Sequence, residues 1–172
     1  MNINTDMYFF KACLWASEKN ITDTVFNNSS EAKGSCSRAQ AITYLWRAFG
    51  SPRPVLKTSR FADVGIDAYY YDAVLWAAES GITFGMHSGV FRPNSRCTRA
   101  QMITFLWRAL GYPEEKTKHT RFSDVFYGEY YTDAVLWAEE CGITNGISKK
   151  HFGPDMTCSH AQALTFLYRA LK

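Results

Sequence analysis

A period of 61 residues is the strongest pattern in this sequence. Three cysteines and three tryptophans each recur at this interval along the 172 residues: Cys36, Cys97 and Cys158, and Trp15, Trp76 and Trp137. When residues 61–111 are aligned with residues 122–172, about half of the positions are identical. A period that holds twice without a gap predicts a chain built from three copies of one supersecondary unit.

The repeat also indicates where the units begin and end. Polar, proline-containing connectors span 51–60 and 112–121 and align with each other. Counting each connector with the unit that follows it, we expect units at 1–50, 51–111 and 112–172, which together form one structural domain. The first unit is shorter and more divergent, because it lacks the Phe-x-Asp-Val motif that follows both connectors.

Composition limits the classes of protein that this chain can belong to. With 47% hydrophobic and 16% aromatic residues it can bury a core. The formal net charge of +3 is spread along the chain, which argues against nucleic-acid binding but favours an anionic partner. No apolar stretch approaches the roughly 20 residues of a membrane span. The first eight residues lack the pattern of a signal peptide, although a fragment of a longer protein would not show one.

Each unit carries the signals of two helices. In the first helix, apolar residues recur at helical spacing, as at Tyr69, Ala73 and Trp76. That helix is expected to end in a Schellman motif, with glycine or asparagine in the left-handed conformation before an isoleucine. The three predicted stops are Asn20-Ile21, Gly81-Ile82 and Gly142-Ile143.

The second helix of each unit begins with a capping box. A Ser or Thr is followed three residues later by Gln, so that two side chains satisfy two free backbone amides. The three pairs are Ser37 and Gln40, Thr98 and Gln101, and Ser159 and Gln162. These helices are apolar on two sides, as expected at the centre of a bundle, and Gly50 and Gly111 should end two of them. Phe91 and Phe152, in the loops, are expected to fill the gap between the helices of their own unit.

Several motifs in a fixed order bring a known family to mind. In the second unit they are Phe61-x-Asp63-Val64, Trp76-Ala77, Gly81-Ile82-x-x-Gly85, Phe91-x-Pro93 and Thr98-Arg99-Ala100-Gln101. This pattern resembles the S-layer homology (SLH) module, and the resemblance spans essentially the whole chain. It implies an all-α fold, namely a pseudo-threefold bundle of three helix-loop-helix modules whose second helices form the central core.

The resemblance also implies a function. SLH modules attach proteins to the bacterial envelope without covalent bonds, so the expected partner is an anionic secondary cell-wall polysaccharide, often pyruvylated, held in grooves between modules at the extracellular surface. The positions that match the family's glycan contacts are Arg38, Asp63, Gly85, Arg99, Asp124 and Gly146. An arginine in the first turn of a helix would add its donors to the positive end of the helix dipole, which suits a carboxylate.

The chain departs from the family pattern in ways that matter for binding. Gln replaces the usual Glu of the capping motif in all three units, His160 stands where Arg is expected, and Thr24 replaces the glycine of the first unit. At most two grooves therefore look complete. The alternative is a protein–protein interaction module that keeps the scaffold while its glycan grooves have decayed.

The repeated aromatic and cysteine positions have simpler interpretations than ligand binding. Trp76 and Trp137 could stack on sugar rings, but each lies on its helix's apolar stripe, which favours core packing. The cysteines at the 61-residue interval each precede a helix cap and lack a CxxC or histidine pair, so we expect packing and no metal site. The odd total of five cysteines does not describe a disulfide scaffold.

The remaining repeated charges do not describe an enzyme. No second acid recurs beside Asp63 or Asp124, as glycoside hydrolysis would need, so neither catalysis nor a cofactor is expected. Glu79 and Glu140 recur at the end of the first helix, where a solvated or loop-bonding role is favoured. The recurring arginines near the end of the second helix, Arg47, Arg108 and Arg169, are interpreted as structural.

Overall fold

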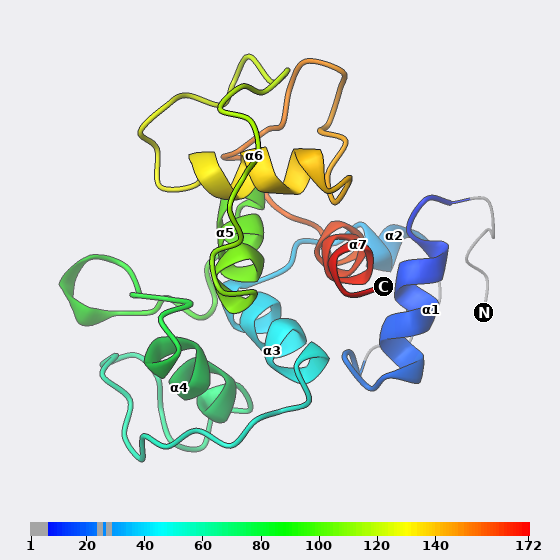
Figure 1. Ribbon diagram of the computed structural model, residues 1–172. Coiled ribbons are helices and arrows are strands. Elements are labelled where there is room, and N and C mark those ends of the chain that lie inside the picture. The colour runs from blue at the N-terminus through cyan, green and yellow to red at the C-terminus, as the bar shows by residue number, and fades with distance from the viewer. Residues whose placement is uncertain (1–6, 24–25, 27–28) are drawn as a thin grey trace.

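The computed structural model describes residues 7–23, 26 and 29–172, and this part of the chain is all-α, without a β-strand (Figure 1). Its helices are α1 (Phe10–Glu18), α2 (Ser29–Ala32), α3 (Arg38–Ala48), α4 (Tyr71–Glu79), α5 (Arg99–Ala109), α6 (Thr132–Glu140) and α7 (His160–Leu171). A single 3-10 turn covers His87–Gly89. The predicted fold class is confirmed.

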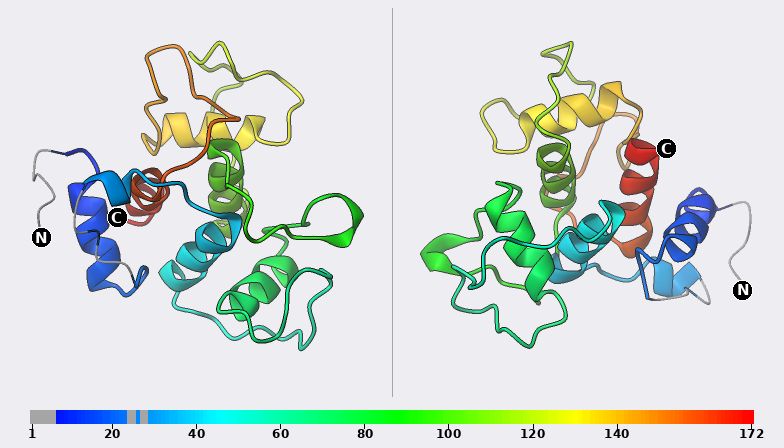
Figure 2. Two further views of the ribbon diagram at one scale, coloured as in Figure 1. Left: turned by 180° about the vertical axis from the view of Figure 1, so that it is seen from behind. Right: turned by 60° about the horizontal axis from the view of Figure 1, so that its bottom comes forward.

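The second helices of the units form the centre of the molecule. Helices α3, α5 and α7 contact one another, and α1, α4 and α6 lie outside them, which gives a pseudo-threefold bundle (Figures 1 and 2). The inner helices contribute fully buried side chains such as Ile42, Ile103 and Leu164 to one continuous core. Their apolar character on two sides follows from this central position.

Each outer helix packs on the inner helix of the preceding unit. Helix α4 packs on α3, α6 on α5, and α1 closes the ring on α7. The loop phenylalanines lie at these contacts between units. Phe91 is fully buried, and its ring lies against Phe61 and 4.8 Å from the guanidinium carbon of Arg38, which belongs to the first unit. Phe91 therefore contributes to the junction between the first and second units.

The repeated cysteines lie around the pseudo-threefold axis. Their backbones form a closed ring of hydrogen bonds: Cys36 N donates to Cys158 O (3.0 Å), Cys97 N to Cys36 O (2.9 Å), and Cys158 N to Cys97 O (2.8 Å). Burial raises the pKa of all three thiols, so they stay protonated and unreactive at neutral pH. Within residues 7–23, 26 and 29–172, no three His, Cys, Asp or Glu side chains are placed to hold a metal ion. All three side chains are fully buried, which agrees with the predicted packing role of these cysteines.

The helix ends follow the predicted signals. All three capping boxes are present, with both the hydroxyl–amide and the Gln–amide bond. In the three Schellman motifs the amides of Ile21, Ile82 and Ile143 each donate over 2.8 Å to the carbonyl five residues earlier. Asn20 adopts a φ of 54°, which replaces the glycine that the other two units use.

The connectors are fastened to the ends of the outer helices. The Glu79 carboxylate accepts hydrogen bonds from the amides of Val55 and Leu56, and Glu140 does the same for Lys116 and Thr117. The loop-bonding role of these acids is confirmed. The contacts fix the path of each connector from an inner helix to the next outer helix.

Candidate functional site: three grooves between units

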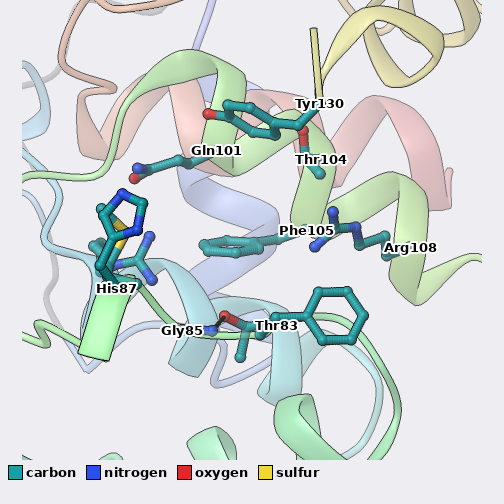
Figure 3. A pocket seen from close by; sticks show the side chains of 11 residues that line it. Thr83, Gly85, His87, Gln101, Thr104, Phe105, Arg108 and Tyr130 are labelled. Atoms are coloured by element: carbon teal, nitrogen blue, oxygen red, sulfur yellow. Dashed lines mark hydrogen bonds between the residues drawn. The ribbon is translucent and has the colours of Figure 1, made fainter. Parts of the chain in front are cut away.

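Two equivalent grooves lie where three units meet. Groove A, about 420 Å³, is lined by Arg38, the loop Thr83–His87, four residues of α5 (Gln101, Thr104, Phe105, Arg108) and Tyr130. Groove B, about 410 Å³, is lined by the matching residues Arg99, Thr144–Ile147, Gln162, Thr165, Phe166, Arg169 and Tyr8. In groove A, Tyr130 and Gln101 face the loop at Thr83 and Gly85 across Phe105 and Arg108 (Figure 3).

The predicted arginines lie in the walls of these grooves. Arg38 is only 3% exposed, and its Nε donates to Phe91 O over 2.9 Å. Its guanidinium also lies over the Phe105 ring, with the carbon 5.4 Å from the centroid. One terminal amino group of Arg38 is buried without a partner among the residues described. Burial lowers its pKa, but a guanidinium remains charged at neutral pH.

Arg99 repeats this arrangement in groove B. Its Nε donates to Phe152 O over 2.8 Å, and the guanidinium carbon lies 4.7 Å from the Phe152 centroid and 5.3 Å from that of Phe166. Arg99 is 2% exposed, and its terminal Nη2 likewise has no partner in the described part of the chain. A buried charged donor left unpaired is costly. Each groove thus has a strong donor that an anionic ligand can complete.

The starts of the inner helices are not open anion sites, which corrects the expectation based on the helix dipole. The amides of Arg38 and Ala39 donate to the carbonyls of Ser95 and Pro93 in the next unit, at 2.9 and 3.0 Å. The amide of Gln40 donates to the Ser37 hydroxyl of the capping box. Since these donors are occupied, attraction of an anion rests on the arginine side chains.

A second arginine lies in each groove, and this position was not predicted from the sequence. Arg108 donates from Nη1 to Ile82 O over 3.2 Å, so its structural role is confirmed, but it also lines groove A. Its guanidinium carbon lies 5.1 Å from the Phe84 ring, and its buried Nε has no partner in the described chain. Arg169 has the matching position in groove B, with Nη1 donating to Ile143 O. The sequence shows that these arginines recur every 61 residues, but it does not show that they line a groove.

Tyrosines from a third unit complete the grooves, and these were also missed. Tyr130 lines groove A and is 54% exposed, while Tyr8 lines groove B and is 60% exposed. Tyr69 lies at the equivalent place in a third groove. The interval of 61 residues relates all three, so their recurrence was visible in the sequence although their place in a groove was not.

The predicted aspartates lie beside the arginines but hold the loops. Asp63 accepts from the amides of Phe91 and Arg92, both at 2.7 Å. Asp124 accepts from Phe152 and Gly153, both at 2.8 Å. The backbone of each loop phenylalanine therefore links an aspartate to an arginine. The amide of Phe91 or Phe152 donates to the aspartate, and the carbonyl of the same residue accepts from the arginine. The aspartates do not line grooves A or B, and their contact with a glycan stays a prediction.

The predicted glycines do line the grooves, whereas the tryptophans do not. Gly85 and Gly146 have φ values of 79° and 75°. A Cβ on Gly85 would lie 2.4 Å from Cε1 of Phe61, so the loop can close only around glycine. Trp76 and Trp137 are 8% and 7% exposed and belong to the core, as their position on the apolar stripes favoured.

In a third groove, groove C, the arginine that lines it among the described residues is already paired. It is lined by Thr22, Asp23, Gln40, Thr43, Tyr44, Arg47 and Tyr69. Arg47, the counterpart of Arg108, forms a 2.8 Å ion pair with Asp23. His160, the counterpart of Arg38, lies with Nδ1 3.1 Å from the Tyr44 hydroxyl, and burial lowers its pKa. Thr24, the substitute for the groove glycine, lies outside the described residues.

Comparison with known proteins agrees with this architecture. Residues 60–103 and 121–164 match the S-layer homology domain and together make up about half of the chain. The chain therefore belongs to the S-layer homology family. No helix in the described part of the chain is long and apolar enough to cross a membrane.

Similar proteins include surface proteins and enzymes whose names denote activity on glycans. A cell surface protein of Thermoanaerobacter kivui is 36% identical over 118 residues, which cover 66% of this chain and 16% of that protein. The surface-layer 125 kDa protein of Lysinibacillus sphaericus is 28% identical over 69% of this chain and 10% of its own length. Endo-1,4-beta-xylanase A of Thermoanaerobacterium saccharolyticum is 32% identical over 58% of this chain and 9% of its own length. The chain thus spans only a small part of each relative.

Proposed function

We propose that this protein attaches to the bacterial cell envelope by binding an anionic secondary cell-wall polysaccharide in grooves A and B, without catalysing a reaction. The observation that carries the proposal is a buried guanidinium with an unused donor in each groove, Arg38 in one and Arg99 in the other. Membership of the S-layer homology family and the surface proteins among the relatives support an extracellular, wall-associated location.

The composition of the grooves suits an acidic sugar. A carboxylate, such as that of a pyruvate ketal, can accept hydrogen bonds from the two arginines of one groove. The exposed ring of Tyr130 or Tyr8 offers an apolar face to a pyranose, and Gln101 or Gln162 offers polar groups to its hydroxyls. Phe84 and Met86 make groove A more apolar than groove B, where Asn145 and Ile147 replace them.

We further propose that the first unit is a diverged third SLH module. Helix α1 occupies the same place on α7 as α4 does on α3, so the first unit completes the bundle. Its groove C contains an ion pair between Arg47 and Asp23 and a histidine of lowered pKa nearby. Attachment therefore depends on grooves A and B, and groove C contributes scaffold.

The test is retention on purified cell walls before and after removal of the secondary polymer. The protein should be retained only on walls that keep the polymer. Replacing Arg38→Gln together with Arg99→Gln keeps a donor for the loop carbonyls but removes both buried charges. Because a charged hydrogen bond contributes about 1.5–3 kcal/mol, affinity should fall roughly 10-fold or more.

A matched control separates local from general electrostatics. Arg53→Gln with Arg96→Gln removes the same charge from exposed positions that line neither groove and should leave retention unchanged. Circular dichroism and unfolding curves must show that both double variants fold. A folded Arg38/Arg99 variant that binds polymer-bearing walls as well as the native protein would contradict the proposal.

That last outcome would favour the second candidate function, a protein–protein interaction module. Groove C is the observation that favours this second function, because the charge of Arg47 is already neutralised there by Asp23. Equal retention on walls with and without the secondary polymer would also favour binding to a protein receptor.

A further inference from the structure

Groove A differs from groove B in one loop. Residues 83–87 of groove A are Thr-Phe-Gly-Met-His, and the aligned residues 144–148 are Thr-Asn-Gly-Ile-Ser. Every other residue that lines groove A has the same residue type at the matching position of groove B. The differences between the two grooves therefore come from three side chains of groove A, namely Phe84, Met86 and His87.

The shape of the loop does not depend on these three side chains. In groove A the Thr83 hydroxyl accepts from the amide of Gly85 over 3.2 Å, and in groove B the Thr144 hydroxyl accepts from the amide of Gly146 over 3.1 Å. Both glycines have a left-handed conformation, with φ values of 79° and 75°. Since Asn145 supports the same loop, Phe84 is not needed to form it.

Phe84 is a large apolar side chain that remains in water. It is 62% exposed although it lines groove A. The guanidinium carbon of Arg108 lies 5.1 Å from its ring centroid, and that of Arg60 lies 5.9 Å from it. Arg60 is itself fixed by a 2.7 Å hydrogen bond from Nη2 to Thr83 O. These contacts hold the ring beside the groove, so a ligand that covers its exposed surface gains free energy.

Groove A also has more unused donors than groove B. Arg38 Nη2 and Arg108 Nε are buried without a partner in the described chain, whereas Arg99 Nη2 is the one such atom among the described residues of groove B. Arg108 lies against the Phe84 ring, which excludes water from one side of the guanidinium. Because an ion pair is stronger where water is excluded, groove A should hold a carboxylate more firmly than groove B.

A simple carboxylate would satisfy the arginines but would leave Phe84 uncovered. A pyranose presents C–H groups that pack on an aromatic ring, so an acidic sugar can use the arginines and Phe84 together. We infer that groove A is the principal site for an anionic pyranose, that Phe84 is its specificity-determining residue, and that groove B is a weaker site. This ranking rests on the proposed function and deepens it, because it assigns the difference between the grooves to one side chain.

The probe is D-glucuronate, which carries a carboxylate on a pyranose. It is compared with acetate, which has the charge without the ring, and with D-glucose, which has the ring without the charge. Each is titrated into the 172-residue chain, and the amide NMR signals of Gly85 and Gly146 report on grooves A and B separately. Glucuronate should have a dissociation constant at Gly85 about 10-fold below that at Gly146, since contact with one aromatic ring contributes roughly this factor.

Exchange of residues between the grooves tests Phe84 directly. Phe84→Asn gives groove A the residue of groove B and should raise the dissociation constant at Gly85 about 10-fold. Asn145→Phe is the reverse change and should lower the dissociation constant at Gly146. Tyr127→Asn is the matched control, because it removes an aromatic ring that is 67% exposed and lines neither groove. It should leave the preference for groove A unchanged.

The other two differences between the loops are tested in the same way. Met86→Ile and His87→Ser also install groove B residues, and each should reduce the preference less than Phe84→Asn does. An equal or larger effect of either variant would overturn the assignment to Phe84. So would a preference that survives Phe84→Asn in a variant whose NMR spectrum shows the native fold.

The probes themselves can also contradict the inference. Equal dissociation constants of glucuronate at Gly85 and Gly146, or no binding at Gly85, would overturn it. A preference of acetate for groove A as large as that of glucuronate would assign the difference to charge and remove the role of the ring. Binding of D-glucose as tight as that of glucuronate would show that the site does not select an anion.

The ranking of the grooves and the proposed function can fail separately. On cell walls, Arg38→Gln alone should lower retention more than Arg99→Gln alone, because it disables the principal groove. If only the ranking is wrong, the two single variants lose retention equally, yet retention still requires the secondary polymer. If only the proposed function is wrong, glucuronate still prefers groove A while walls retain the protein equally with and without the polymer.

Discussion

At the scale of single residues, one helix position shows how a substitution decides the chemistry of a groove. Arg38, Arg99 and His160 all begin an inner helix. The arginines are held by a loop carbonyl and keep an unused donor, whereas His160 contacts the rings of Tyr44 and Phe26. Burial of His160 favours the neutral imidazole.

His160 should make the fold sensitive to acid. The unfolded chain binds a proton at the ordinary pKa of 6.5, whereas the folded chain resists protonation until lower pH. The stability from the neutral imidazole is thus complete above about pH 6.5 and is lost as the pH falls. His160→Gln should reduce the loss of stability between about pH 7.5 and 5.5, measured by urea unfolding. His151→Gln, at an exposed position, is the control, and an equal effect of both variants would contradict this prediction.

Asp124 should contribute chiefly to stability. Asp124→Ala removes the acceptor of two loop amides, so we expect a loss of about 1–3 kcal/mol in the free energy of unfolding. Asp124→Asn keeps one carbonyl acceptor and should cost less. Wall retention of the folded Ala variant then separates two roles. Unchanged retention would limit Asp124 to holding the loop, and reduced retention would support its predicted glycan contact.

At the scale of elements, the sequence predicted the helix caps and helix stops, because these depend on residues close together in the chain. Capping boxes and Schellman stops involve groups only three to five residues apart, and all of them occur where expected. The partner of each outer helix was not predictable in this way. The loop between two helices of a unit allows α4 to pack on α5 or on α3, and the contacts that decide it are nonlocal. The sequence therefore located the ends of the outer helices and the starts of the inner helices, but it predicted neither the short helix α2 nor the pairing of the helices.

The caps themselves should have a measurable effect. Thr98→Ala removes the hydroxyl that accepts from Gln101 N at 3.2 Å, which should destabilise the protein by about 1 kcal/mol. Thr98→Ser keeps that hydroxyl and should be nearly neutral. Chemical unfolding monitored by circular dichroism gives both values, and an equal loss in the two variants would assign the effect to the threonine methyl group instead.

At the scale of the whole molecule, each groove is a property of the closed ring. Groove A takes Arg38 from the first unit, α5 from the second and Tyr130 from the third. Arg38 and Gly85 could be placed in a groove because the family motifs name them. Tyr130 and Arg108 could not, because only the packing of three units brings them together.

This interlocking predicts that the bundle unfolds as one unit. Ile21, Ile82 and Ile143 occupy equivalent positions, and each is 1% exposed. Replacing any of them with Ala should cost about 2–5 kcal/mol, because each leaves a similar cavity in the shared core. Tryptophan fluorescence and circular dichroism should then report one coincident transition in every variant. An early, separate transition in Ile21→Ala would instead mean that the first unit unfolds independently of the second and third units, although α1 packs on α7.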